Sequence, residues 1–85
     1  MEESFVQSRT SDVLAEVRSA AAALVDREEV KVRSRMLAYE IIGTMVGTSG
    51  MQIRRLVNGY PGATLNYVVG HNIMAVYRRV TGKTE

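Results

Sequence analysis

The chain has 85 residues, no cysteine and a formal net charge of +2. This length suits one small domain, near the lower limit for a self-sufficient core, so we expect support from dimerisation or a partner. The missing cysteines exclude a disulfide framework and a zinc site with thiolate ligands. The sequence has no run of about twenty apolar residues, and its acidic start differs from a signal peptide, so we expect a cytoplasmic, all-α protein without a membrane partner.

Charge is unevenly distributed along the sequence. Residues 1–30 hold three arginines against seven acids, a net of −4, whereas residues 31–85 hold eight Lys or Arg against two Glu, a net of +6. A basic half matches the electrostatic footprint that a phosphate backbone requires. The simpler alternative is a charge-segregated protein with no such function.

The first half predicts one helix. Residues 1–10 show no periodicity, and we expect them to be disordered. Residues 11–29 carry apolar side chains at three- and four-residue steps, which predicts an acidic amphipathic helix capped by Ser11 or Asp12. Its apolar stripe either packs against the basic half or pairs with a second chain; too few heptads are present for a coiled coil, so we expect packing within the chain. The alternating pattern of residues 30–34 predicts a linker.

The basic half predicts a helix-turn-helix over residues 34–59 and a C-terminal helix over residues 64–81, which gives a single domain of four to five helices. We expect Gly47 to end the first helix of the pair and Thr64 to cap the last helix. The methionines, among them Met36 and Met74, are expected to fill the core. The apolar positions expected to face the core are Leu37, Ile41, Ile42, Met45 and Val46 in the first helix of the pair and Leu65, Val69, Ile73, Val76 and Val80 in the last helix.

Six positions between Tyr39 and Asn58 meet the steric requirements of a helix-turn-helix. The fifth place must be small because the second helix crosses over it, and Gly43 occupies it. The ninth place needs a positive backbone dihedral for the sharp turn, and Gly47 occupies it. Two core helices around a glycine-rich turn are the alternative that other small helical proteins share. The four apolar places that fill the wedge between the helices are Ile42, Val46, Ile53 and Leu56.

The run GTSGMQIRRLVNG, residues 47–59, is similar to the recognition-helix segment of phage-repressor-like helix-turn-helix domains. The resemblance covers about twenty residues around Tyr39 to Gly59 and includes the Ser-Gly near the helix start and the Asn-Gly after it. It implies a fold of four or five short helices. It also implies that the second helix of the pair lies in the major groove of DNA.

The outward face of that second helix predicts the residues that contact DNA. The planar fork of Arg55 matches the two acceptors of guanine, Gln52 suits adenine, and Met51 suits the methyl group of thymine. Gly50 is expected to leave room for a phosphate or base edge. The complete set expected at the DNA is Thr44, Thr48, Ser49, Gly50, Met51, Gln52, Arg54, Arg55 and Asn58, with the two threonines, Ser49 and the amides at the helix start contacting phosphate.

The sequence gives less support to other classes of function. The basic half has one acid, Glu40, before the final residue, no lysine where a phosphate-binding loop needs it, and a single histidine, His71. We therefore expect no enzyme, and no cofactor, metal or small-molecule ligand. The leading hypothesis is a sequence-specific double-stranded DNA-binding transcriptional regulator, a repressor or an activator, that acts as a homodimer. The alternative is a protein-interaction module, an antiactivator or small inhibitor, that docks on a protein partner through its acidic N-terminal helix.

Overall fold

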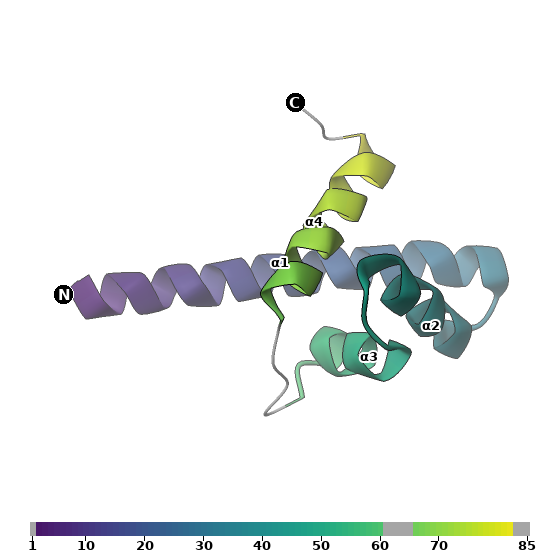
Figure 1. Ribbon diagram of the computed structural model, residues 1–85, viewed down its shortest axis with the longest axis horizontal. Helices are drawn as coiled ribbons and strands as arrows, with labels where there is room; N and C mark the ends of the chain where they lie inside the picture. The colour runs from purple at the N-terminus through teal and green to yellow at the C-terminus, as the bar shows by residue number, and fades with distance from the viewer. Residues whose placement is uncertain (1, 61–65, 83–85) are drawn as a thin grey trace.

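The computed structural model describes the backbone of residues 2–60 and 66–82, and the side chains of residues 13–60 and 66–82. Over these ranges the chain is entirely helical apart from short connections, as expected for a small all-α domain (Figure 1). None of the described helices combines the length and the hydropathy of a membrane span. The helices are α1 (Glu2–Val32), α2 (Arg35–Val46), α3 (Gly50–Asn58) and α4 (Tyr67–Thr81).

The first helix begins earlier than the sequence pattern predicts. The backbone is helical from Glu2, within the stretch 1–10 for which the sequence pattern predicts disorder. Neither Ser11 nor Asp12 caps the helix, because both lie within it. A helix that has already nucleated gains one hydrogen bond for each residue it adds, and it can therefore extend over a stretch without apolar periodicity.

The first helix also ends later than predicted. It continues through Val32, where a linker is expected, and Val32 packs against the core. Arg33 then adopts a left-handed backbone with φ 60°, which an α-helix of L-residues cannot continue. Ser34 follows in an extended conformation, and its side chain accepts a hydrogen bond from the amide of Leu37 at 3.1 Å. The reversal between α1 and α2 therefore needs only two residues.

The C-terminal two thirds of α1 form the surface on which the domain is assembled. Helices α2, α3 and α4 each contact α1, whereas its N-terminal part runs clear of all three (Figure 1). The apolar stripe of α1 is thus buried within the chain, as expected. The buried apolar residues of the core are Val17, Ala20, Ala21, Leu24 and Val25 of α1, Ala38, Tyr39, Ile42 and Val46 of α2, Ile53 and Leu56 of α3, and Ile73 and Val76 of α4.

Three residues of α2 expected in the core are exposed instead. Leu37 is 48% exposed, Met45 49% and Met36 59%. The helix buries Ala38 and Tyr39 in their place. The small side chain of Ala38 is fully buried, whereas the larger apolar side chains of Leu37 and Met45 lie outside the buried stripe. Which apolar stripe of a helix is buried depends on its neighbours as well as on its own sequence.

The last helix begins after its predicted start. Asn66 caps it by accepting hydrogen bonds from the amides of Val68 and Val69, at 2.7 and 3.3 Å. Thr64 and Leu65, predicted as the cap and the first core residue, lie outside the described residues. The remaining predicted stripe is confirmed, since Ile73 and Val76 are buried and Val69 and Val80 pack partly buried against the core.

Candidate nucleic-acid interface

The crossing of α2 and α3 is a contact between backbones. A Cβ atom placed on Gly43 would lie 2.7 Å from the carbonyl carbon of Ser49 and 2.9 Å from the amide nitrogen of Gly50. No side chain fits in that space without displacing the backbone of α3. The expected requirement for a small residue at this place is therefore confirmed.

A three-residue turn joins the two helices. Gly47 has φ 89° and ψ 32°, the left-handed conformation that glycine adopts at little cost. The amides of Gly47 and Thr48 both donate to the carbonyl of Gly43, at 3.0 and 2.8 Å. Ser49 then caps α3 by accepting a hydrogen bond from the amide of Gln52 at 3.2 Å. With the four wedge residues buried as well, all six steric expectations of the motif are met.

This crossing leaves one face of α3 against the core and turns the other outward. Ile53 and Leu56 are 1% and 6% exposed, and Val57 packs partly buried beside them. No hydrogen bond to another described residue holds the side chain of Arg54 or Arg55. The exposed side chains that the structure brings together on the outer face are Met51, Gln52, Arg54, Arg55 and Asn58, the same five that the sequence predicts to point outward.

The other residues predicted to contact DNA surround the start of α3, and they differ in their exposure. Thr44 and Ser49 are exposed, and Thr48 is partly buried. Gly50 is buried, which corrects the expectation that it leaves room for a ligand. A Cβ atom on Gly50 would lie 2.7 Å from Oε2 of Glu40 and 3.0 Å from its amide nitrogen. The glycine therefore allows α3 to pack closely on α2.

Glu40 is a neighbour of the site that the sequence reasoning missed. Its carboxylate lies beside Gly50, the first residue of α3, where the helix dipole favours a negative charge. The same charge opposes a phosphate at the predicted amide site. The position has a detectable signal, because Glu40 stands one helical turn before Gly43 on the face of α2 that α3 crosses.

Two further side chains, also missed, fix the ends of the helix pair. Arg18 of α1 donates from Nε to the carbonyl of Leu56 near the end of α3, at 2.9 Å. Asn72 of α4 donates from Nδ2 to the carbonyl of Val46, the last residue of α2, at 3.0 Å. Carbonyls at helix C-termini have no partner within their helix, and a cation there is favoured by the dipole. The flanking helices thus hold the pair in place through polar contacts as well as apolar packing.

The two arginines of α4 lie apart from the outer face of α3. Arg78 and Arg79 lie at the C-terminal end of α4, on the opposite side of α1 from α3 (Figure 1). Lys31 forms a weak ion pair with Glu28, at 3.8 Å. Among the described residues, α3 itself contributes two exposed arginines, Arg54 and Arg55.

Arg35 joins α1 to α2. Its Nη1 lies 2.8 Å from carboxylate oxygens of both Asp26 and Glu29, and its Nε donates to the hydroxyl of Tyr39 at 3.1 Å. The hydrogen bonds to Asp26 and then Glu29 raise the pKa of Arg35 further above its ordinary value, so its charge is permanent. This side chain serves the corner between the helices and is not available to a ligand.

Comparison with known proteins identified no relative of this chain. No family model, curated protein or solved structure matches the chain. Over the part of the chain that the structure describes, no three His, Asp or Glu side chains gather as metal ligands. The functional argument therefore depends on the geometry of α2, α3 and their surroundings.

Replacing Gly43 tests the crossing. We expect Gly43→Ala to lower the free energy of unfolding by about 1 to 3 kcal/mol, because the new methyl group overlaps the backbone of Ser49. Urea denaturation followed by circular dichroism measures the change. Thr44→Ala, at the next and exposed position of α2, is the matched control and should have little effect. An unchanged unfolding midpoint for Gly43→Ala would contradict a close crossing at this residue.

Replacing Arg18 tests the anchoring of α3. We expect Arg18→Met to cost about 1 to 2 kcal/mol, since it removes a charge-assisted hydrogen bond at a helix C-terminus while keeping much of the apolar stem. Hydrogen exchange should show the largest loss of protection in the last turn of α3. Arg27→Met makes the same change at an exposed position of α1. Equal losses of stability in the two variants would contradict the anchoring role.

Proposed function

We propose that the chain is a sequence-specific double-stranded DNA-binding regulator of transcription, with α3 as the helix that reads the major groove. The observation that carries this proposal is the backbone contact of Gly43 with Ser49 and Gly50. With the turn at Gly47, it sets α3 across α2 and turns the five outer side chains away from the core. An α-helix fits the major groove of B-DNA, which is about 12 Å wide.

The chemistry of the outer face supports base reading more than general phosphate binding. Arg55 offers two parallel donors to the acceptors of guanine, and Gln52 offers a donor and an acceptor to adenine. Met51, 60% exposed, presents a flexible apolar surface that suits a thymine methyl group. Arg54 and Asn58 lie beside these residues, where they can contact phosphate or sugar.

A homodimer would provide a DNA interface large enough for a specific site. One α3 has nine residues and two arginines, a small contact for a specific site. Two copies related by a two-fold axis would place their recognition helices in successive major grooves, about 34 Å apart, on a near-palindromic sequence. If the two Arg54 side chains of a dimer neutralise two phosphates, the logarithm of the affinity should fall with the logarithm of salt with a slope of about −1.8.

The second candidate is a protein-interaction module, and the projection of α1 favours it. The N-terminal part of α1 runs clear of the other helices (Figure 1). Against it, Asp26 and Glu29 are held by Arg35 within the chain, which leaves fewer acidic groups for a basic protein partner. The two candidates differ in their response to duplex DNA and to salt.

Fluorescence anisotropy with a random-sequence duplex separates the candidates. A DNA-binding regulator should bind the duplex at low salt and lose affinity steeply as salt increases. Selection of bound sites from a random duplex library would then report both the preferred sequence and the spacing of half-sites. An absence of binding at low salt would contradict the DNA-binding function and favour the protein-interaction module.

Replacing Arg55 tests base reading. We expect Arg55→Ala to weaken binding to the selected site by about 1 to 3 kcal/mol and to relax preference at one base pair, because a bidentate contact with guanine is lost. Anisotropy with the selected site and single-base variants measures both effects. Arg27→Ala on α1 is the control with the same change of charge. If Arg55→Ala lowered thermal stability but left DNA binding unchanged, the assignment of the outer face would be wrong.

Replacing Glu40 tests the carboxylate at the start of α3. We expect Glu40→Gln to tighten binding to duplex DNA by about 1 kcal/mol, roughly fivefold, because one repulsion between a carboxylate and a phosphate is removed. Glu28→Gln on α1 makes the same change of charge away from the α3 start. Anisotropy of both variants at low salt measures the difference. Equal affinities of the two variants would show that phosphate does not approach Glu40.

A further inference from the structure

The N-terminal third of α1, residues 2–12, projects beyond the other described helices. Its backbone runs clear of α2, α3 and α4 (Figure 1), and among the described side chains of α1, residues 13–32, the first that is buried is Val17. Residues 2–12 alone form about 16 Å of helix at a rise of 1.5 Å per residue. A helix segment of this length gains most of its stability from packing, so it needs a surface to cover.

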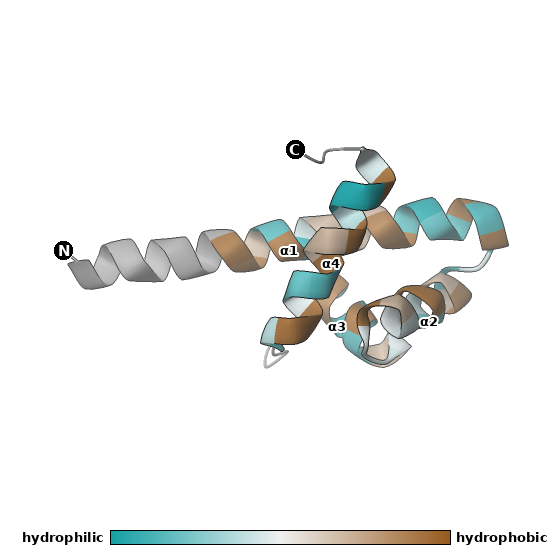
Figure 2. Ribbon diagram, turned by 45° about the horizontal axis from the view of Figure 1, so that its top comes forward, coloured by the Kyte–Doolittle hydropathy of each residue, from teal (hydrophilic) through white to brown (hydrophobic). Residues whose placement is uncertain are grey.

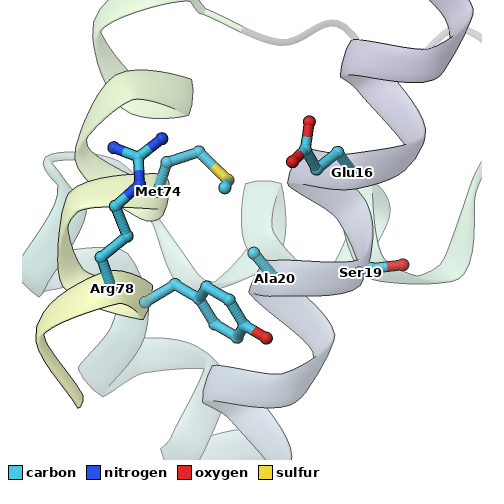
Figure 3. Close-up of a pocket in the computed structure, with 6 residues that line it drawn as sticks. Glu16, Ser19, Ala20, Met74 and Arg78 are labelled. Atoms are coloured by element: carbon cyan, nitrogen blue, oxygen red, sulfur yellow. The ribbon is translucent and has the colours of Figure 1, made fainter. Parts of the chain in front are cut away.

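A groove lies at the base of this projection, between α1 and α4. One hollow of about 360 Å³ is lined by Glu16, Ser19, Ala20, Met74, Tyr77 and Arg78. A neighbouring hollow of about 330 Å³ shares Met74 and Arg78 with the first, and Val13 and Tyr67 are among its other lining residues. Figure 3 shows Glu16 and Arg78 on opposite walls, with Met74 between them. We refer to the two hollows together as the α1–α4 groove.

The α1–α4 groove is bordered by exposed apolar residues. Val13 is 56% exposed, Val68 61% and Tyr67 89%, and the start of α4 is visibly hydrophobic (Figure 2). Large apolar side chains that cluster on the surface of a small domain are typical of an interaction site. No residue of α2 or α3 lines the groove, so a partner seated there leaves the outer face of α3 accessible.

Charge complementarity identifies the occupant as a second copy of the chain. Residues 2–12 contain three acids and one arginine, a net of −2, whereas α4 carries two arginines and no acid, a net of +2. Arg78 lines the groove, with Glu16 on the facing wall, and Arg79 is the next residue in the last turn of α4. Because α1 is one continuous helix, residues 2–12 point away from the α4 of their own chain. The acidic segment can therefore reach the basic C-terminal end of α4 only on another molecule.

We propose that two copies pair through antiparallel α1 helices, with residues 2–12 of each chain seated in the α1–α4 groove of the other. A two-fold axis between the α1 helices makes the interface self-complementary, as in most homodimers. The acidic start of each α1 then lies beside Arg78 and Arg79 of the second copy. The apolar spacing of α1 also continues into the segment, since Val6 precedes Val13 by seven residues, or two helical turns.

A charge-exchange experiment tests this interface in the full-length chain. The variants are Glu2→Lys with Glu3→Lys, Arg78→Glu with Arg79→Glu, and all four changes together. We expect the wild type to dimerise, each reversal pair to raise the dimer dissociation constant about tenfold, and the four-fold variant to recover most of that loss. Sedimentation equilibrium over a range of protein concentrations measures the constants. Circular dichroism checks that each variant is folded.

The control is Arg54→Glu with Arg55→Glu on α3, which should leave the dissociation constant unchanged. A wild type that stays monomeric at about 0.5 mM, far above the range of a specific dimer, would overturn the proposal. A dimer insensitive to both reversal pairs, or one not recovered by the four-fold variant, would also overturn it. The proposal does not depend on DNA binding: if charge exchange restores the dimer but no duplex is bound, only the proposed function fails.

Discussion

The contact that organises this domain is the one where the backbone of Gly43 meets the backbone of Ser49 and Gly50. At 2.7 Å from a virtual Cβ atom, the spacing admits hydrogen atoms and nothing larger. The close approach lets the four wedge residues pack in one apolar layer. The direction of α3 is set by a contact between main-chain atoms. A second glycine on α3, Gly50, extends the close approach to Glu40. The pair therefore behaves as one rigid unit that the other helices must accommodate.

The flanking helices hold that unit at its exposed carbonyl ends. Arg18 reaches α3 across 38 positions of sequence, and Asn72 reaches α2 across 26. Asn72 supplies a donor to the carbonyl of Val46, and Arg18 adds a second donor to the carbonyl of Leu56, which also accepts from the amide of Gly59. Such hydrogen bonds contribute more to stability where the surrounding core excludes solvent. Helices α1 and α4 thus contribute apolar surface and also bind the C-terminal ends of α2 and α3, which stop at Gly47 and Gly59.

The sequence predicted the features that depend on local spacing and missed those that depend on distant partners. Gly43, Gly47 and the wedge positions were identifiable because their constraints lie within twenty consecutive residues around the turn. The burial of Ala38 instead of Leu37 was not, since both faces of α2 contain apolar residues and the neighbours decide which one is covered. The contacts of Arg18 and Asn72 had no periodic signal, because a single polar side chain that contacts the end of another helix leaves no pattern in its own helix.

The ends of α1 show the same limit in another form. Apolar periodicity marks where a helix is packed, and the packed part of α1 is close to the predicted range. The helix itself extends beyond that range at both ends, because propagation needs only backbone hydrogen bonds and no breaker precedes Arg33. A periodic pattern of apolar side chains indicates which part of a helix is buried. It gives no information about helical segments that are exposed.

The carboxylate of Glu40 beside α3 has a consequence for how such a protein would search a genome. General attraction to the DNA backbone holds a regulator on the many sequences that are not its target, and those sequences outnumber the target by orders of magnitude. If the chain binds DNA as proposed, α3, with two arginines and with Glu40 of α2 beside its start, would be retained only briefly on such non-target sequences. Its occupancy of the correct site would then depend on contacts with base edges. In a small population, most molecules would remain free in solution until they reached that site.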